Sequence, residues 1–413
     1  MIKPYVSAHP SPGGNENTDK LKALFSRIVK MRPVVTYCPE KDPYPDDKRI
    51  KAILFSGLPF NGHETRAFAY MGFPENASAD SPVPGMVLVH GGGGHAYAEW
   101  VRYWIDNGYA AISFDGFGQR YVGPDNTYDA SLDFWKYDPS AQPPMEDYAI
   151  KDKAFEEHGF TFFVADVVLA NTVLRRDKRV MSGSVGYTGI SWGGIGGGLA
   201  VCLDSRFSFA APVYGSGFQF VSKTEWGEVF RGEGVSDVWD AGLLLGEPDM
   251  PMHWFNSDSD PFFDANASTA CAAAAKNGSL TLIHGFTHGQ IEGSALPEIL
   301  RFADEMNGKG QRNIKVMSVR RTENGGEISF SLPDDVQNVK AFLYYKTEDL
   351  IYSGKYLRES WKSVFGELTG DTAFFPVPAN AHIFYFALEG QTKGGQTLHA
   401  STGTYTREIW DKN

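Results

Sequence analysis

The hydrophobic and polar positions in the middle of the chain follow two alternating periodicities. Short, continuous apolar runs such as MVLVH (86–90) and FAAPVY (209–214) are typical of strands that are buried on both faces. Stretches with helical spacing lie between such runs, for example residues 160–176 and 192–203. Strands that alternate with helices predict a mostly parallel, doubly wound sheet, so we expect an α/β fold. The same pattern predicts further strands at 109–114, 185–190, 252–256 and 279–284, and further helices at 97–107, 261–276 and 295–306.

The chain that precedes these elements has a different pattern. Residues 49–55 and 65–71 alternate apolar and polar side chains, and the Asn-Gly pair at 61–62 is a hairpin signal. An antiparallel pair of strands should therefore lead into the sheet. Residues 1–47 are irregular and proline-rich, with one amphipathic stretch at 21–29, and we expect an N-terminal arm whose helix lies across the following domain.

The pattern changes again after the polar segment NGKGQRN (307–313). Short alternating strands with Gly and Pro turns follow, and none has helical spacing, which predicts a β-sandwich. The sequence thus predicts three parts: an arm (1–47), an α/β domain (48–310) and a C-terminal β-sandwich domain (311–413).

Two connections in the α/β domain are too long to be ordinary loops. Residues 116–159 and 215–250 both leave the carboxyl ends of predicted strands. Long excursions at that edge often shape a binding site. The first is rich in Tyr, Phe, Pro and Asp and the second contains Trp226 and Trp239, so aromatic side chains are expected above the sheet.

The strongest chemical motif is Gly189-Ile190-Ser191-Trp192-Gly193, the single GxSxG of the chain. It follows a predicted buried strand and opens a Gly-rich helix. Glycines at these positions allow the tight, strained turn that exposes a serine hydroxyl at the end of a sheet. A serine that merely caps the helix is the alternative. The context favours Ser191 as a nucleophile.

A serine nucleophile needs a base within hydrogen-bond reach and a carboxylate that orients this base. His288 lies in the segment GFTHGQ, directly after a predicted strand, and we take it as the base. His284 ends that strand, and we expect it to be a packed, structural histidine.

The segment SDSDPFFD follows another predicted strand and offers three candidates for the acid. Asp260 is our choice because it precedes Pro261, which can occupy the first position of the next helix. Asp258 is the competitor, and Asp264 is expected to point from that helix. The nucleophile, the acid and the base then follow one another along the chain as they do in one hydrolase architecture.

Acyl transfer also requires hydrogen-bond donors for the developing oxyanion. The glycines in MVLVHGGGGHAYAEW follow a buried strand and expose backbone N–H groups. We expect the N–H of Gly92 or Gly93, together with that of Trp192, to form the oxyanion hole.

The same glycine-rich stretch permits a different interpretation. Gly91, Gly93 and Ala96 lie between a strand and a helix, and Asp115 ends the next strand, which together satisfy a dinucleotide-binding fingerprint. Such a fingerprint normally opens its domain instead of following a hairpin. It also leaves the GxSxG motif unexplained, so we consider it the weaker hypothesis.

Three segments resemble a known family: GMVLVHGGGGHAYAEWVRYWIDNGYAAISFDGFGQ, VGYTGISWGGIGGGLAVCLDSRFSFAAPVYG and MPMHWFNSDSDPFFD. They are similar to α/β-hydrolases of the acetyl xylan esterase branch, which is related to dienelactone hydrolases and prolyl-oligopeptidase-type enzymes. The resemblance extends over residues 48–306. The strands after residue 311 resemble an immunoglobulin-like or fibronectin-like appendage, with much less motif content.

This resemblance implies Ser191 as the nucleophile, Asp260 as the acid and His288 as the base. It also implies that N–H groups of the HGGGG stretch and of Trp192 bind the oxyanion. Where such enzymes commonly have Gly-x-x-Asp in the acid loop, this chain has Ser257-Asp258-Ser259-Asp260. The departure keeps Asp260 in register but leaves Asp258 as a substitute.

The charge and the cysteine content bear on which binding partners and which cellular location we expect. The formal net charge is −12, and the whole acidic excess lies before residue 311. An acidic chain without a basic stripe argues against nucleic acid and anionic membranes as partners. The three cysteines, Cys38, Cys202 and Cys271, form no zinc-site or disulfide pattern, and no secretion signal or membrane span is evident, so a cytoplasmic location is the default expectation. A secreted chain whose signal had been removed would have the same sequence features.

The sequence thus predicts a serine esterase that needs no metal or organic cofactor. Its expected substrate is a small acyl ester of a carbohydrate or a similar alcohol, because the bulky Trp192 adjoins the nucleophile and aromatic-rich loops follow. A peptidase or lactone hydrolase on the same fold is an alternative, and so is a catalytically silent binding protein. Assembly into a homo-oligomer is left open.

Overall fold

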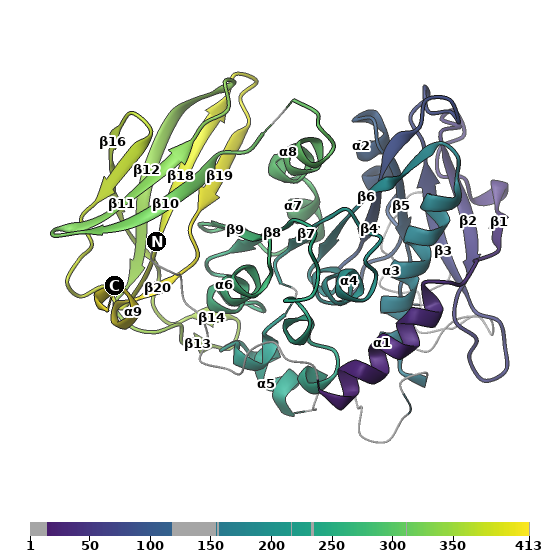
Figure 1. Cartoon of the computed structure of the whole chain (residues 1–413), viewed down its shortest axis with the longest axis horizontal. Coiled ribbons are helices and arrows are strands. Elements are labelled where there is room, and N and C mark those ends of the chain that lie inside the picture. The colour runs from purple at the N-terminus through teal and green to yellow at the C-terminus, as the bar shows by residue number, and fades with distance from the viewer. Residues whose placement is uncertain are drawn as a thin grey trace.

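The computed structural model describes residues 15–117, 154, 157–215, 217–232, 235–310 and 312–412. We call residues 15–310 the α/β region and residues 312–412 the C-terminal β region (Figure 1). The strands of the α/β region are β1 (Val35–Tyr37), β2 (Ile50–Ser56), β3 (Arg66–Gly72), β4 (Val83–Val89), β5 (Ala110–Phe114), β6 (Val180–Ile190), β7 (Phe209–Val213), β8 (Met252–Ser257) and β9 (Gly278–Ile283). Its α-helices are α1 (Glu16–Ile28), α2 (Ala98–Asp106), α3 (Gly159–Arg176), α4 (Trp192–Leu203), α5 (Glu225–Gly232), α6 (Ala265–Ala274), α7 (Gln290–Ser294) and α8 (Pro297–Met306).

These nine strands form one sheet in the order β1-β2-β3-β5-β4-β6-β7-β8-β9. The first strands pair antiparallel, with Ile50 of β2 opposite Gly72 of β3, and β3 pairs antiparallel with β5. From β5 to β9 every neighbouring pair is parallel. The mostly parallel sheet and the antiparallel hairpin that precedes it confirm the α/β prediction.

The hairpin turn between β2 and β3 has the conformation that the Asn-Gly pair predicts. Asn61 has a φ of 49° and Gly62 a φ of 77°, so both residues are in the left-handed region. This region is accessible to glycine and tolerated by asparagine.

Helix α3 is buried on all sides, which explains the continuous apolar character of its sequence. Residues 159–174 are all buried. Helix α1 packs against α3 and α4 through Leu21, Leu24, Phe25 and Ile28, and its first turn is capped by Asn15, whose side chain accepts the Thr18 N–H at 2.9 Å. The amphipathic stretch of the arm therefore forms a helix across the α/β region, although it begins earlier than predicted.

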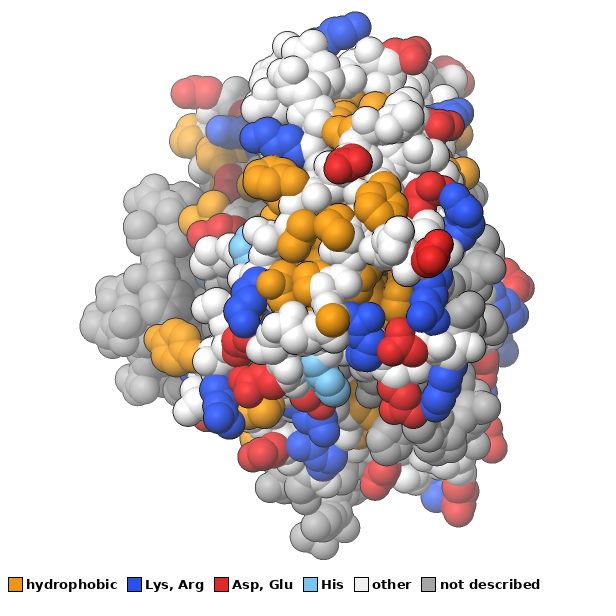
Figure 2. Space-filling model, turned by 90° about the vertical axis from the view of Figure 1, so that its left-hand side faces the viewer, with side chains coloured by type: hydrophobic (Ala, Val, Ile, Leu, Met, Phe, Trp, Pro, Cys, Tyr) orange, Lys and Arg blue, Asp and Glu red, His pale blue; other side chains and the backbone are white. Residues whose placement is uncertain are grey.

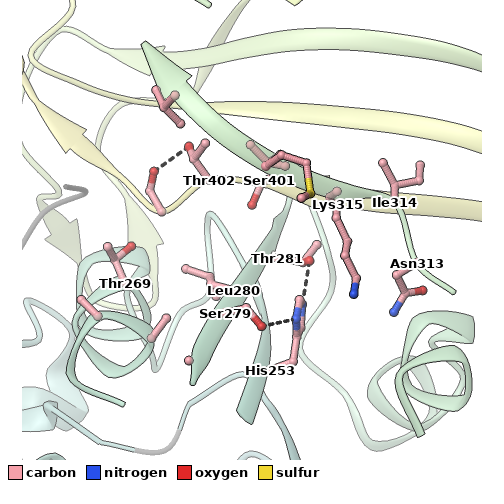
Figure 3. A pocket seen from close by; sticks show the side chains of 18 of the residues that line it. His253, Thr269, Ser279, Leu280, Thr281, Asn313, Ile314, Lys315, Ser401 and Thr402 are labelled. Carbon is pink, nitrogen blue, oxygen red and sulfur yellow. Dashed lines mark hydrogen bonds between the residues drawn. The ribbon is translucent and has the colours of Figure 1, made fainter. Parts of the chain in front are cut away.

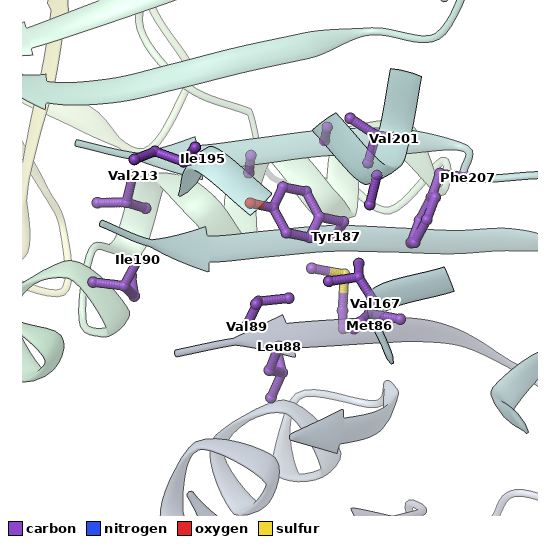
Figure 4. Packing of buried hydrophobic residues seen from close by; sticks show 14 of the residues in the cluster. Met86, Leu88, Val89, Val167, Tyr187, Ile190, Ile195, Val201, Phe207 and Val213 are labelled. Carbon is purple, nitrogen blue, oxygen red and sulfur yellow. The ribbon is translucent and has the colours of Figure 1, made fainter. Parts of the chain in front are cut away.

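The core between the sheet and α4 is built around β4 and β6 (Figure 4). Tyr187 points from β6 toward α4, and its hydroxyl donates a hydrogen bond to the carbonyl of Gly193. Met86 and Val89 of β4 and Val201 of α4 complete this buried cluster. The strand that carries the GxSxG motif is thus fixed to the helix that follows it.

The two long connections have different outcomes. Most of 116–159 lies outside the described residues. The connection 215–250 contains α5 and three short 3-10 helices, η3 (Gln219–Val221), η4 (Val235–Asp237) and η5 (Ala241–Leu243). Asp240 organises part of it by accepting the N–H groups of Phe218, Gln219 and Gly242 at 2.6–2.7 Å. Short helices and hydrogen bonds to one carboxylate therefore give this long connection a defined local structure.

The C-terminal β region contains two main antiparallel sheets. One has the order β10-β11-β17-β16, the other contains β15-β12-β18-β19 with β20 paired to β18, and β13 and β14 form a small hairpin. A separate apolar cluster, which includes Ile328, Phe375 and Phe386, lies between the sheets. The elements are β10 (Lys315–Thr322), β11 (Gly325–Ser331), β12 (Val336–Lys346), β13 (Tyr352–Ser353), β14 (Tyr356–Leu357), β15 (Lys362–Phe365), β16 (Glu367–Thr369), β17 (Thr372–Phe375), β18 (Ile383–Thr392), β19 (Thr397–Ser401), β20 (Tyr405–Thr406) and α9 (Arg407–Asp411).

The C-terminal β region packs against the last strand of the large sheet. Strand β19 lies beside β9, and the Leu282 N–H of β9 donates to Ser401 Oγ at 2.6 Å. Tyr344, Trp361 and Tyr385 belong to the same apolar cluster as the core of the α/β region. The two regions therefore share buried surface.

A cavity of about 740 Å³ lies between the two regions (Figure 3). At its floor, His253 of β8 is hydrogen-bonded to Ser279 and Thr281 of β9, and burial lowers its pKa to about 3, so the ring is neutral. Lys315 and Ser401 line the opposite side. None of the residues around this cavity is a candidate for the chemistry predicted above.

The outer face of the C-terminal β region carries both signs of charge. Figure 2 shows hydrophobic side chains gathered in the middle of this face and surrounded by interspersed basic and acidic side chains. This mixture agrees with the balance of charges after residue 311.

Within the described ranges, no helix combines the length and the apolar character that a membrane span requires.

Candidate active site

Ser191 lies at the sharp turn between β6 and α4. Its backbone has φ 55° and ψ −110°, a conformation that is rare for a residue with a side chain and costs roughly 1–3 kcal/mol. Its N–H donates to the Val213 carbonyl of β7 at 3.1 Å, and its hydroxyl does not cap α4. Helix capping therefore does not account for the strained turn, and the interpretation of Ser191 as a helix cap is wrong.

The glycines around Ser191 are required by close packing. A Cβ on Gly193 would lie 2.2 Å from the Val89 carbonyl oxygen. A Cβ on Gly189 would lie 2.3 Å from the Tyr187 hydroxyl. Because these neighbours are backbone or buried atoms, only glycine allows the turn to approach β4 and β6 so closely.

His288 and Asp260 form a hydrogen-bonded pair in the loops that follow β9 and β8. The distance from His288 Nδ1 to Asp260 Oδ2 is 2.7 Å. Asp260 is fully buried, and its other oxygen accepts the N–H groups of Phe262 and Phe263, both at 2.8 Å. The carboxylate is thus fixed and solvated by the protein, and it orients the imidazole with Nδ1 as the donor.

Aromatic rings surround His288. Tyr214, which directly follows β7 and has a φ of 75°, stacks on it with ring centroids 4.2 Å apart. The Tyr214 hydroxyl donates to the Thr287 carbonyl at 2.7 Å and accepts the Gly289 N–H at 3.1 Å. Burial raises the pKa of Tyr214, so the hydroxyl stays protonated. Phe262 contacts the histidine edge-on at 4.8 Å.

Sequence reasoning missed Tyr214, and only its position at the end of the predicted strand in FAAPVYG could have drawn attention to it. Its hydrogen bonds to Thr287 and Gly289 join residues more than 70 positions apart in the chain, so the local sequence pattern does not reveal them.

Ser191 and His288 lie at the same edge of the sheet, and the glycine-rich loop after β4 links their surroundings. The N–H of Gly91 donates to Oε1 of Gln290, two residues beyond His288, at 3.1 Å. A Cβ on Gly91 would lie 3.3 Å from Cβ of Ser191. Across the described ranges, the Ser191 hydroxyl makes no hydrogen bond to His288. Such bonds often tighten only when substrate binds.

The glycine-rich loop is fixed by His90, which is fully buried. Gly116 donates its N–H to His90 Nε2 at 3.0 Å, so the proton is on Nδ1, which donates to the Gly91 carbonyl at 2.7 Å. Burial lowers the pKa of His90 to about 4, and the ring is neutral at physiological pH. Sequence reasoning did not single out this residue.

Gly92 and Gly93 are exposed at the tip of this loop. In the described part of the chain, neither donates its N–H to another group. Gly93 has a φ of 68°, and a Cβ on Gly92 would lie 2.5 Å from Cδ1 of Trp192. The indole of Trp192 therefore packs on the loop and keeps it near the start of α4.

Trp192 is part of an aromatic wall beside Ser191. Its ring stacks on Phe230 at 5.9 Å and meets Trp226 edge-on at 5.4 Å, both from α5. Phe160 of α3 lies 6.2 Å from it. Of the two tryptophans expected above the sheet, Trp226 contributes to this wall, and Trp239 is buried against Phe160 at 5.3 Å.

The competing acid, Asp258, has different partners. Its Oδ2 lies 2.6 Å from Nδ1 of His284, and Asp258 is fully buried. His284 directly follows β9 and stacks on Tyr344, as expected of a packed strand-end histidine, although its side chain is 41% exposed. The hydrogen bond to Asp258 raises the pKa of His284. The loops after β8 and β9 therefore contain two neighbouring His–Asp pairs, and Asp260 is the acid that pairs with His288.

Asp264 does not point from the helix as expected. It is the residue before α6 and caps it, with Oδ1 accepting the Ala267 N–H and Oδ2 accepting the Lys223 N–H. The predicted helix start at Pro261 is also wrong, because Asp260 takes the N–H groups of the next turn and the helix begins only at Ala265.

The residues of the dinucleotide fingerprint are engaged in the protein itself. The Asp115 carboxylate accepts the Phe117 N–H at 2.9 Å, and Asp115 is only 4% exposed. The Gly91 N–H is used by Gln290. The Asp115 carboxylate and the Gly91 N–H, which would bind a ribose and a pyrophosphate, are therefore already bonded within the protein.

Cys38 and Cys271 are buried, Cys202 is half-buried, and all three are free thiols. Among the described residues, no group of three or more His, Cys, Asp or Glu side chains is placed to hold a metal ion.

The sheet order, the strained serine turn after β6 and the loops that carry an acid and a histidine after β8 and β9 define an α/β-hydrolase fold. Among solved structures, the chain is similar to an acetyl xylan esterase from a Paenibacillus species, with a TM-score of 0.54, 17% identity and coverage of 74% of this chain and 97% of that one. It is also similar to acetyl xylan esterase 1 from a Thermoanaerobacterium species, with a TM-score of 0.53, 12% identity and coverage of 72% and 95%.

No protein-family model and no curated protein matches the sequence. At such identities the structural likeness establishes a common fold, and it confirms the fold that the sequence resemblance implied. The roles of individual residues stay predictions.

Proposed function

We propose that this protein is a serine carboxylic-ester hydrolase that removes acetyl or other small acyl groups from a carbohydrate or a similar alcohol. One observation carries the proposal: Ser191 occupies a strained turn at the edge of the sheet where Asp260 orients His288 by a 2.7 Å hydrogen bond. A strained serine turn is maintained against a cost in stability, which favours a functional role.

The chemistry follows from these positions. Ser191 Oγ attacks the ester carbonyl and forms a new C–O bond, while its proton passes to Nε2 of His288. The tetrahedral oxyanion is expected to accept N–H groups of Gly92 or Gly93 and of Trp192. When the intermediate collapses, the bond to the alcohol oxygen breaks and His288 protonates the leaving alcohol. In the second half of the reaction, His288 takes a proton from water, whose oxygen attacks the acyl-enzyme carbonyl. The bond to Ser191 Oγ then breaks, His288 returns the proton to Ser191, and the carboxylic acid is released.

Asp260 has a constant role in these steps. Because its carboxylate is buried and accepts the His288 Nδ1–H, it keeps Nε2 available as the proton acceptor and stabilises the imidazolium. The N–H groups of Phe262 and Phe263 hold its side chain in place.

Two observations support a small acyl group and a larger alcohol. The indole of Trp192 follows the nucleophile directly and is backed by Phe230 and Trp226, which forms a bulky wall. Trp226 and Phe262 are partly exposed near His288 and offer flat surfaces on which a sugar ring can stack. The fold likeness to two acetyl xylan esterases agrees with this substrate class.

The test is hydrolysis of p-nitrophenyl acetate and of acetylated oligosaccharides, compared with esters of long acyl chains, by the wild type, Ser191→Ala and the remote control Ser331→Ala. We expect activity on acetyl esters that Ser191→Ala abolishes and Ser331→Ala retains. A preference for long acyl chains would contradict the substrate class. Failure of a folded wild type to react with a fluorophosphonate probe would contradict the serine nucleophile and favour a binding protein.

A further inference from the structure

The loop between β8 and α6 is held by the C-terminal β region as well as by its own neighbours. Asp258 lies at its start and is fully buried. The hydroxyl of Tyr385 on β18 donates to Asp258 Oδ2 at 2.8 Å, and Nε1 of Trp361 donates to the Asp258 carbonyl at 2.9 Å. The C-terminal β region thus binds both the side chain and the backbone of one residue in the acid loop.

Asp258 has a full set of partners, so its position is closely determined. Besides Tyr385, its carboxylate faces Nδ1 of His284 at 2.6 Å and accepts from the Ser259 hydroxyl at 2.8 Å and the Gly285 N–H at 3.2 Å. If one hydrogen-bond donor to a buried carboxylate is removed, the carboxylate loses part of its stabilisation, and it and its remaining partners shift to compensate.

The two residues that reach Asp258 are themselves rigidly packed. Tyr385 is fully buried and Trp361 is 8% exposed, and their rings meet edge-on at 5.2 Å. Tyr344 stacks on Tyr385 at 5.3 Å and on His284 at 4.3 Å. Burial and the nearby Asp258 charge raise the pKa of Tyr385, so its hydroxyl remains a donor.

Asp258 and Asp260 are separated by a single residue, Ser259. A shift of Asp258 is therefore transmitted to the carboxylate that orients His288. The His288–Asp260 bond of 2.7 Å leaves little tolerance, because a misplacement of about 1 Å in a catalytic group can cost roughly 100-fold in rate.

We infer that Tyr385 and Trp361 are positioning residues for the candidate catalytic acid, and that the C-terminal β region is part of the catalytic unit. They act through Asp258 and do not touch the reacting atoms. The kinetic consequence rests on the proposed esterase function, but the structural one, a fixed Asp260–His288 bond, does not.

The experiment compares Tyr385→Phe with Tyr405→Phe in the full chain. Both substitutions remove one buried hydroxyl from the C-terminal β region, and Tyr405 packs in the separate apolar cluster between the C-terminal sheets. For Tyr385→Phe we expect kcat for p-nitrophenyl acetate to fall about 10- to 100-fold with KM within about twofold, because orientation is lost and not binding. Tyr405→Phe should keep the wild-type kcat even if it melts earlier.

A second pair of variants tests the backbone contact. Trp361→Phe removes the indole N–H and keeps an aromatic ring, and Trp410→Phe, in the apolar cluster between the C-terminal sheets, is its control. The expected result is again a loss of kcat in the first variant only.

A readout without turnover separates this inference from the proposed function. The proton that His288 donates to Asp260 is followed by NMR in the full-length variants. We expect its resonance to broaden or disappear in Tyr385→Phe and to persist in Tyr405→Phe. If the wild type hydrolyses no ester, the proposed function fails and this resonance still decides the positioning role. A wild-type resonance and kcat in Tyr385→Phe, with only a lower melting temperature, would overturn the inference.

Discussion

Tyr214 stacks on His288 and at the same time bonds the loop that carries it. The ring centroids are 4.2 Å apart, and the hydroxyl joins the Thr287 carbonyl and the Gly289 N–H on either side of the histidine. His288 is therefore held through its neighbours in the chain as well as by Asp260.

Tyr214→Phe keeps the stacking and removes both loop hydrogen bonds. We expect a loss of about 1–2 kcal/mol in the free energy of unfolding, at roughly 1 kcal/mol per bond, measured by urea denaturation. Ester hydrolysis should also fall, because the loop around His288 gains freedom. Tyr109→Phe, which loses a bond to Asp304 remote from the site, should match the loss of stability and retain activity. Equal activities of the two variants would refute this role.

Gln290 links the loop that carries His288 to the glycine-rich loop after β4. Gln290→Leu leaves the buried Gly91 N–H without an acceptor, at a cost of about 1–3 kcal/mol. We expect the glycine-rich loop to relax and kcat for p-nitrophenyl acetate to fall by about 10-fold or more, since the proposed oxyanion donors, Gly92 and Gly93, adjoin Gly91. Gln290→Glu retains the acceptor and should be closer to the wild type in stability. The prediction fails if the two variants unfold at the same urea concentration.

The close approach of α4 to β6 makes its glycines intolerant of a methyl group. A Cβ on Gly197 would lie 2.1 Å from the Tyr187 ring, so Gly197→Ala should destabilise the protein by about 2 kcal/mol despite the better helix propensity of alanine. Gly183, in β6, has no atom within 4 Å of the corresponding position and no positive φ. The free energy of unfolding of Gly183→Ala should therefore lie within about 0.5 kcal/mol of the wild-type value. Chemical denaturation of both variants compares the two sites, and equal stabilities would contradict the packing argument.

The His284–Asp258 pair predicts a pH dependence of stability. The folded-state pKa of His284 is raised, chiefly by its hydrogen bond to Asp258. The stabilisation that the pair gives to the folded state is therefore complete below the pKa of His284 in the unfolded chain, which is about 6.5. This stabilisation declines as pH rises through the higher pKa of His284 in the folded state. The difference in unfolding free energy between the wild type and His284→Gln should be largest near pH 5.5 and should shrink toward pH 9. A difference that grows with pH would show that the assigned sign is wrong.

The strand and helix pattern could be predicted from sequence because it depends on local periodicity. Element ends were less predictable. Pro261 is compatible with a first helical turn, but the Asp260 side chain takes the N–H groups of Phe262 and Phe263 and delays the helix to Ala265. This competition between a side chain and the helix is not visible in the hydrophobic pattern.

Within the candidate site, the motif and the loop order led to Ser191, Asp260 and His288. Spacing alone could not assign the acids to the histidines, because the two His–Asp pairs have separations of 26 and 28 residues. The supporting contacts of His90 and Gln290 could not be predicted, since they depend on how distant loops meet.

The position of the C-terminal β region against β9 has a further consequence for the behaviour of the chain in the cell. β9 is the last strand of the nine-stranded sheet, and Ser401 of β19 occupies one of its outward N–H groups. An uncovered strand edge is a template on which another chain can add a strand. We therefore expect a proteolytic cut or premature stop that removes this region to expose the edge of β9 to strands of other chains.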